Sequence, residues 1–125
     1  MLLQLDFSSE IPIYLQIRNQ IVIGIAEGQL KPGDKLPTIR ALAQEAGINM
    51  MTVNKAYALL KQEGHIIADR RSGAAVSGIP LEGGLDEKEK EALRLLVSQA
   101  KLSGMKLNEL LELCTAYYEN EEEER

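Results

Sequence analysis

One segment, TIRALAQEAGINMMTVNKAYALLKQEG, constrains the fold of this chain more than any other. Ala43 precedes Gly47 by four residues, Ile48 follows the glycine directly, and Val53 stands six residues after it. Two helices that cross closely need a small residue at the contact, a glycine in the turn, and apolar residues that fill the gap. The spacing therefore predicts a helix-turn-helix. The alternative is a generic helical core without a ligand.

Local signals define the ends of these two helices. Thr38 and Asn49 are residue types that cap helix N-termini through a side-chain oxygen, and Gly47 and Gly64 are typical helix stops. The apolar periodicity between these signals predicts helices over residues 39–46 and 50–63.

A further helix and a hairpin flank this pair. Isoleucines recur every four residues from Ile13 to Ile25, which predicts an amphipathic helix over residues 12–26 with Pro12 in its first turn. After Gly64, the apolar runs HIIA and AAVS are separated by DRRSG, which favours a β-hairpin with a charged tip. The expected fold is mostly α: an N-terminal winged helix, made of three helices plus a β-hairpin wing, followed by a C-terminal two-helix hairpin.

The charge is divided unevenly along the chain. Residues 1–80 hold eight Lys and Arg against seven Asp and Glu, a net charge of +1, whereas residues 81–125 hold six against twelve, a net charge of −6. The change coincides with SGIPLEGG, whose proline and glycines are typical of a boundary. We therefore expect two units, 1–80 and 81–125.

The C-terminal unit has more apolar side chains than two short helices can cover. It begins with Asp86 and Glu89 in the spacing of a capping box, and Cys114 falls on an apolar stripe, where we expect a small core residue. Dimerisation is the expected use of this surface. The residues predicted to form the dimer contact are Leu93, Leu96, Leu107, Leu110, Leu111 and Tyr118.

Composition argues against several other classes of protein. No apolar run approaches the roughly 20 residues of a membrane span, and the N-terminus lacks a basic signal-peptide region, so we expect a cytoplasmic chain without membrane contact. A single cysteine and a single histidine, Cys114 and His65, do not supply a disulfide or a structural zinc site. The sequence has no phosphate-cradling loop of the Walker type and no evident catalytic set, so we expect neither an enzyme, nor a cofactor, nor a metal.

The N-terminal unit resembles a known family. The stretches GQLKPGDKLPTIRALA and TVNKAYALLKQEGHI are similar to motifs of GntR-type transcription regulators, over residues 11 to about 79. The short C-terminal part resembles the small YtrA-like subgroup, chiefly in its length and its two-helix pattern. The resemblance implies a winged-helix homodimer that binds a pseudo-palindromic operator in double-stranded DNA. We expect no separate ligand domain of the kind that larger relatives carry, so any small-molecule site would lie at the dimer interface. Whether an effector exists stays open.

The same resemblance assigns DNA contacts by position. It places an arginine contact on Arg40, start-of-helix contacts on residues 49–52, later contacts on Asn54 and Lys55, and wing contacts on residues 70–72. The full set of predicted DNA-binding residues, to which we add the junction residue His65, is Arg40, Asn49, Met50, Met51, Thr52, Asn54, Lys55, His65, Arg70, Arg71 and Ser72. Family members usually carry polar residues or proline at the two methionine positions, so this chain has fewer phosphate-type contacts at the helix start.

The residues themselves indicate how such a surface would read DNA. If Ile48 and Val53 are buried, Met50 and Met51 face outward, where a thioether can make apolar contact with thymine methyl groups. Asn54 can form two hydrogen bonds with adenine, and lysine can reach guanine or a phosphate. Alternatively, one methionine packs over the preceding helix and does not contact DNA.

Two arginine positions carry similar alternatives. Adjacent arginines at a wing tip, Arg70 and Arg71, suit a narrow minor groove or phosphates, although charges at a hairpin tip are usually only solvated. Arg40 stands near a helix N-terminus, where a cation opposes the helix dipole, and a phosphate is the expected compensation. We expect a sequence-specific DNA-binding regulator, a repressor acting as a homodimer. The alternative is a winged-helix protein-interaction module that does not bind DNA.

Overall fold

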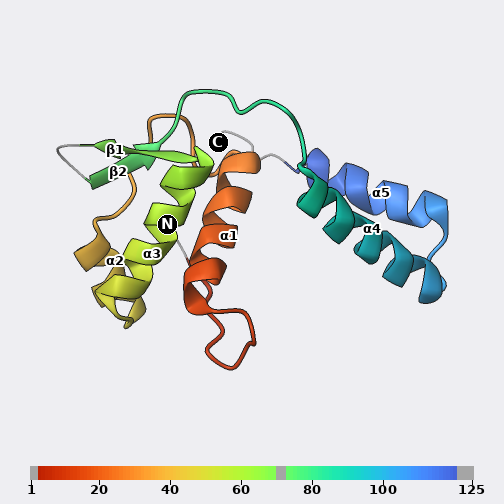
Figure 1. The fold of residues 1–125 in the computed structure, drawn as a ribbon, viewed down its shortest axis with the longest axis horizontal. Helices are drawn as coiled ribbons and strands as arrows, with labels where there is room; N and C mark the ends of the chain where they lie inside the picture. Colours follow the sequence, from red (N-terminus) through yellow and green to blue (C-terminus); the bar gives the residue numbers. More distant parts are fainter. Residues whose placement is uncertain (1–2, 70–72, 121–125) are drawn as a thin grey trace. The chain divides into compact units, whose positions relative to one another are not determined.

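The computed structural model describes residues 3–69 and 73–120, which fall into two compact units on either side of Pro80 (Figure 1). The elements in chain order are α1 (Ile13–Ala26), α2 (Ile39–Ala46), α3 (Met50–Glu63), β1 (Ile66–Asp69), β2 (Gly73–Val76), α4 (Glu87–Leu102) and α5 (Leu107–Tyr118). The first unit contains three helices and a two-stranded sheet, and the second contains two helices. The predicted fold class, a winged helix followed by two further helices, is confirmed.

The two helices of the helix-turn-helix begin and end at the predicted residues. Thr38 Oγ1 accepts a hydrogen bond from the backbone N–H of Ala41 at 3.0 Å, and Asn49 Oδ1 accepts one from the N–H of Met51 at 2.7 Å. Each cap satisfies a backbone donor that has no partner within its own helix. Gly47 adopts the left-handed conformation, with φ at 68°, and this conformation ends α2 and turns the chain into α3.

Helix α1 differs from the prediction at its first residue. Pro12 precedes the helix as its N-cap, because its ψ of 146° is extended, and the helical turn starts at Ile13. Ile17 and Ile21 are fully buried, whereas Ile13 and Ile25 are only half-buried and pack against the edge of the core. The four-residue repeat therefore identified the inward face, with the deepest contacts at its centre.

The wing is an antiparallel hairpin of β1 and β2. Ile66 pairs with Val76 and Asp69 pairs with Gly73. Each strand lies one residue closer to the tip than the apolar runs HIIA and AAVS predicted, because backbone pairing continues past the apolar residues. The tip residues 70–72 lie outside the described part of the chain.

A third segment joins the hairpin, and the sequence did not predict it. Lys35 forms a bridge with Ala75, and the N–H of Leu36 donates to the Ala74 carbonyl at 3.0 Å. The two prolines and the glycine of this segment, LKPGDKLP, are typical of a turn and give no sign of a strand. Pairing with β2 ties the start of the helix-turn-helix to the wing and buries Leu36.

One hydrophobic core holds the first unit together. The apolar stripe of α3 is completely buried and consists of Val53, Ala56, Tyr57 and Leu60. Residues from every element of the unit belong to the same core cluster as this stripe. The core cluster consists of Ile17, Ile21, Leu36, Leu42, Ala43, Val53, Ala56, Tyr57, Leu60, Ile66, Ala74 and Val76.

The second unit is a helical pair without a buried core. The predicted capping box is present: the N–H of Glu89 donates to Asp86 Oδ1 at 2.7 Å, and the N–H of Asp86 donates to Glu89 Oε1 at 3.0 Å. Neither α4 nor α5 contains a buried residue. The expectation that Cys114 is a core residue was wrong, because its side chain is exposed. Two helices in one chain do not enclose it.

Candidate nucleic-acid interface

The crossing of α2 and α3 leaves one face of α3 open to solvent. Ile48 is half-buried against the core, and Val53 is fully buried. The helical period then turns the intervening residues outward. Asn49, Met50, Met51, Asn54 and Lys55 are all exposed, and Thr52 is half-buried. The structure thus brings six of the predicted contact residues together at the beginning of α3.

Met51 does not pack into the protein, and Met50 is covered only in part. The exposed fractions are 46% for Met50 and 78% for Met51. Met51 therefore does not pack over α2, as the alternative interpretation would require. Exposed apolar side chains of this size, beside Asn54, provide apolar contact area next to a hydrogen-bonding amide.

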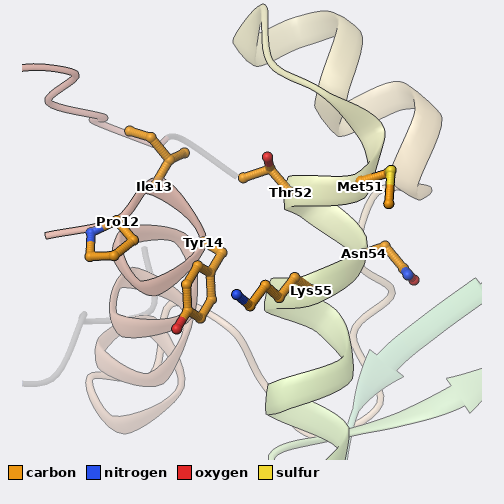
Figure 2. A pocket seen from close by; sticks show the side chains of 7 residues that line it. All are labelled: Pro12, Ile13, Tyr14, Met51, Thr52, Asn54 and Lys55. Carbon is orange, nitrogen blue, oxygen red and sulfur yellow. The ribbon is translucent and has the colours of Figure 1, made fainter.

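An open groove of about 650 Å³ lies beside this face, between α1 and α3 (Figure 2). Its walls are residues 12–14 on one side and Met51, Thr52, Asn54 and Lys55 on the other. In Figure 2 the Lys55 ammonium points toward the Tyr14 ring, and Asn54 points away from α1. The Lys55 Nζ lies 4.1 Å from the centre of that ring, within the range of a cation–π interaction.

Tyr14 was missed as a candidate site residue. In the sequence it belongs to the apolar side of the first helix, and it is indeed half-buried there. Its contact with Lys55 joins residues 41 positions apart in sequence, so the helical period contains no sign of it. The one feature of the sequence that could have drawn attention to Tyr14 is that a large aromatic residue stands in the first turn of a helix, two residues after Pro12.

Arg40 is exposed in the first turn of α2. The segment before it is held from the core side: the buried Tyr57 hydroxyl donates a hydrogen bond to the Pro37 carbonyl at 2.7 Å. Burial raises the pKa of Tyr57 to about 12, so the phenol keeps its proton far above neutral pH. The donor that fixes the approach to Thr38 and Arg40 is therefore always present under physiological conditions.

His65 is not part of the cluster at the beginning of α3. It follows the opposite end of that helix, ten residues beyond Lys55, and each helical residue advances the chain about 1.5 Å. Its side chain is half-buried. The His65 backbone N–H donates to the Leu60 carbonyl, and its own carbonyl accepts from the Ser77 N–H, both at 3.0 Å. These bonds fix the junction between α3 and the wing.

The wing residues cannot be placed in this surface. Arg70, Arg71 and Ser72 lie outside the described residues. The described part of the hairpin ends at the pairing of Asp69 with Gly73.

Among the described residues, no three His, Cys, Asp or Glu side chains gather closely enough to hold a metal ion. Within those same ranges, no helix combines the length and the apolar character needed to cross a bilayer.

The known proteins that this chain resembles include helix-turn-helix transcription regulators. Residues 13–76 match the family described as bacterial regulatory proteins, gntR family. The chain is 39% identical over 114 residues to the HTH-type transcriptional repressor YtrA of Bacillus subtilis, covering 89% of this chain and 88% of that protein.

Two solved structures extend the comparison. One is the structure of YtrA from Sulfolobus acidocaldarius, a GntR-family transcription factor, whose sequence is 42% identical to this chain. The TM-score is 0.58, and the match covers 90% of this chain and 93% of that one. The AraR DNA-binding domain in complex with operator ORX1 is 28% identical, with a TM-score of 0.54 over 60% of this chain and 96% of that one.

Proposed function

Because the chain belongs to the GntR family and is a YtrA-like DNA-binding transcription regulator rather than an enzyme, we propose that it is a cytoplasmic repressor that binds a pseudo-palindromic operator as a homodimer. In this proposal residues 1–80 bind DNA and residues 81–125 form the dimer contact. The observation that carries it is the exposed face at the beginning of α3, where Asn49, Met51, Asn54 and Lys55 stand together.

Each part of this face suits a different part of a duplex. Asn54 can read an adenine edge in the major groove, and Met51 can contact a thymine methyl group. Lys55 and Arg40 supply positive charge for phosphates, which position a protein without specifying sequence. The rest of the proposed contact set is Met50, Thr52, His65 and the wing residues Arg70, Arg71 and Ser72.

The second unit supports a dimer through its apolar surface. Five of the six proposed contact residues are exposed, with fractions from 48% for Leu93 to 92% for Tyr118 and with Leu96, Leu107 and Leu111 between them. Leu110 is half-buried. Such surfaces rarely stay solvated in a soluble protein, and a second copy of the same chain covers them with two-fold symmetry. Two recognition helices related by that symmetry would then meet half-sites about one helical turn apart.

Sedimentation and DNA binding of matched variants test the proposal. Leu96→Lys adds a charge to the proposed contact face, whereas Leu102→Lys adds the same charge to the opposite side of α4, where the side chain is 87% exposed. We expect the wild type and Leu102→Lys to sediment as dimers at micromolar concentration and to protect two half-sites on duplexes selected from a genomic library. Leu96→Lys should be monomeric and bind those duplexes near the non-specific level.

Other outcomes would refute separate parts of the proposal. A dimeric Leu96→Lys variant would move the interface away from this face. A wild-type protein whose duplex binding is absent, even at low salt where phosphate contacts are strongest, would favour the protein-interaction module instead.

A further inference from the structure

The ammonium group of Lys55 is held by an aromatic ring and not by a carboxylate. The Nζ atom lies 4.1 Å from the centre of the Tyr14 ring, and no acidic side chain lines the groove among the described residues. An acidic partner would neutralise the lysine. A ring attracts the cation through its quadrupole and leaves its full charge available to an anion.

The ring itself has a fixed place relative to α3. One turn further along α1, the Arg18 guanidinium binds Glu63 in a two-pronged contact, with Nε to Oε1 at 2.8 Å and Nη2 to Oε2 at 2.6 Å. On either side of Arg18 along the chain, Ile17 and Ile21 are buried in the core. The start of α1 is therefore held against α3, and this fixes the position of the Tyr14 backbone relative to α3.

The segment before α1 strengthens this anchoring. Gln16 Nε2 donates to the carbonyls of Asp6 and Ile11, at 2.9 and 2.8 Å, and Gln16 Oε1 accepts from the Asp6 N–H at 2.8 Å. These three bonds close the N-terminal segment around the first turn of α1, the turn that carries Tyr14.

We propose that Tyr14 is a positioning residue for DNA binding: its ring holds the Lys55 ammonium at the mouth of the groove, ready for a backbone phosphate. A free lysine side chain loses considerable rotamer entropy when it binds an anion. The ring restricts Lys55 before DNA arrives, so part of this loss has already occurred. This inference rests on the proposed function, and it assigns a role in affinity to α1, a helix outside the helix-turn-helix.

The binding experiment uses full-length protein and a selected duplex over a range of salt concentrations. Tyr14→Leu keeps an apolar side chain but removes the ring, and we expect affinity to fall about two- to fivefold, the range of an exposed cation–π pair. Tyr14→Phe keeps the ring and should bind like the wild type. Lys55→Met should lower the salt slope by about 0.9, the value for one phosphate contact. In the Lys55→Met background, Tyr14→Leu should cause no further loss.

A second measurement needs no DNA. In NMR spectra of the free protein, the ring current should move the Lys55 ε-methylene protons upfield, and this shift should disappear in Tyr14→Leu but remain in Tyr14→Phe. Thermal denaturation of each variant checks that the fold is intact.

The outcomes separate this inference from the proposed function. Three results would overturn the positioning role while DNA binding stands. They are a Lys55 NMR signal without an upfield shift, an equal loss of DNA affinity in Tyr14→Phe and Tyr14→Leu, and a loss of affinity on Tyr14→Leu that is just as large in the Lys55→Met background. A shifted signal in a protein that binds no duplex would overturn both the role in DNA binding and the proposed function, although the pair itself exists.

Discussion

Tyr57→Phe removes a single hydroxyl group, the one that links α3 to the segment before α2. In the wild type this hydroxyl donates to the Pro37 carbonyl at 2.7 Å, and the Tyr57 side chain is 2% exposed. Phenylalanine preserves the ring and its packing but leaves the carbonyl without this donor. At pH 7 we expect the free energy of unfolding to fall by about 1 to 1.5 kcal/mol, the net value of one such hydrogen bond.

The same hydroxyl makes the difference in the free energy of unfolding between wild type and Tyr57→Phe depend on pH. Burial raises the pKa of Tyr57 to about 12 in the folded protein, whereas an unfolded tyrosine titrates near the ordinary value of about 10. Between these values the unfolded chain releases its proton first, so the stability contributed by Tyr57 is complete below pH 10 and is lost as pH rises toward 12. One pKa unit corresponds to about 1.4 kcal/mol, so the wild type should lose about that amount between pH 9 and pH 11 through this group.

Urea unfolding followed by circular dichroism, at one fixed protein concentration, measures both effects. The substitution changes no other titratable group, so the difference in the free energy of unfolding between wild type and Tyr57→Phe isolates this hydroxyl. The difference should be largest at pH 7 and should shrink to about zero near pH 11. A difference that stays constant from pH 7 to pH 11 would show that the phenol is not held as a buried donor.

Two further predictions concern the turn and the groove face. Gly47→Ala should lower the free energy of unfolding by about 1 to 2 kcal/mol, because φ is 68° there and an added Cβ meets nothing within 4 Å, so the cost is backbone strain alone. Gly47→Asn should recover part of that loss in thermal denaturation, and equal stability of all three proteins would contradict the strain. Replacing thymine by uracil in a selected duplex should weaken binding of the wild type, and Met51→Ala should lose this sensitivity. Equal affinity of the wild type for both duplexes would remove thymine reading from the proposal.

Much of the candidate site could be predicted from sequence because its signals are local. Thr38 and Asn49 cap helices through donors two or three residues away, and Gly47 ends a helix through its own backbone conformation. The exposure of Met50, Met51, Asn54 and Lys55 followed from the burial of Val53 and its stripe, because the helical period relates all these positions.

The features that sequence analysis missed depend on which elements approach each other. The bridge from Lys35 to Ala75 joins backbone groups 40 residues apart, and neither segment marks its partner by residue type. The contact of Tyr14 with Lys55 likewise exists only because α1 packs along α3. Periodicity assigned Tyr14 to the apolar side of its helix, but only the packing of the two helices places its ring beside the ammonium group.

The second unit gives the complementary case. Sequence alone determined both helices and the capping box of Asp86 and Glu89, since each depends on residues within one turn. Sequence placed Cys114 on an apolar stripe but did not determine what covers that stripe. Only the tertiary structure decided that the side chain is exposed, because burial requires a second surface and α4 and α5 do not enclose one. The helical period of the sequence determines on which face of a helix the apolar side chains lie. Packing between elements that are distant in sequence determines which surface covers them.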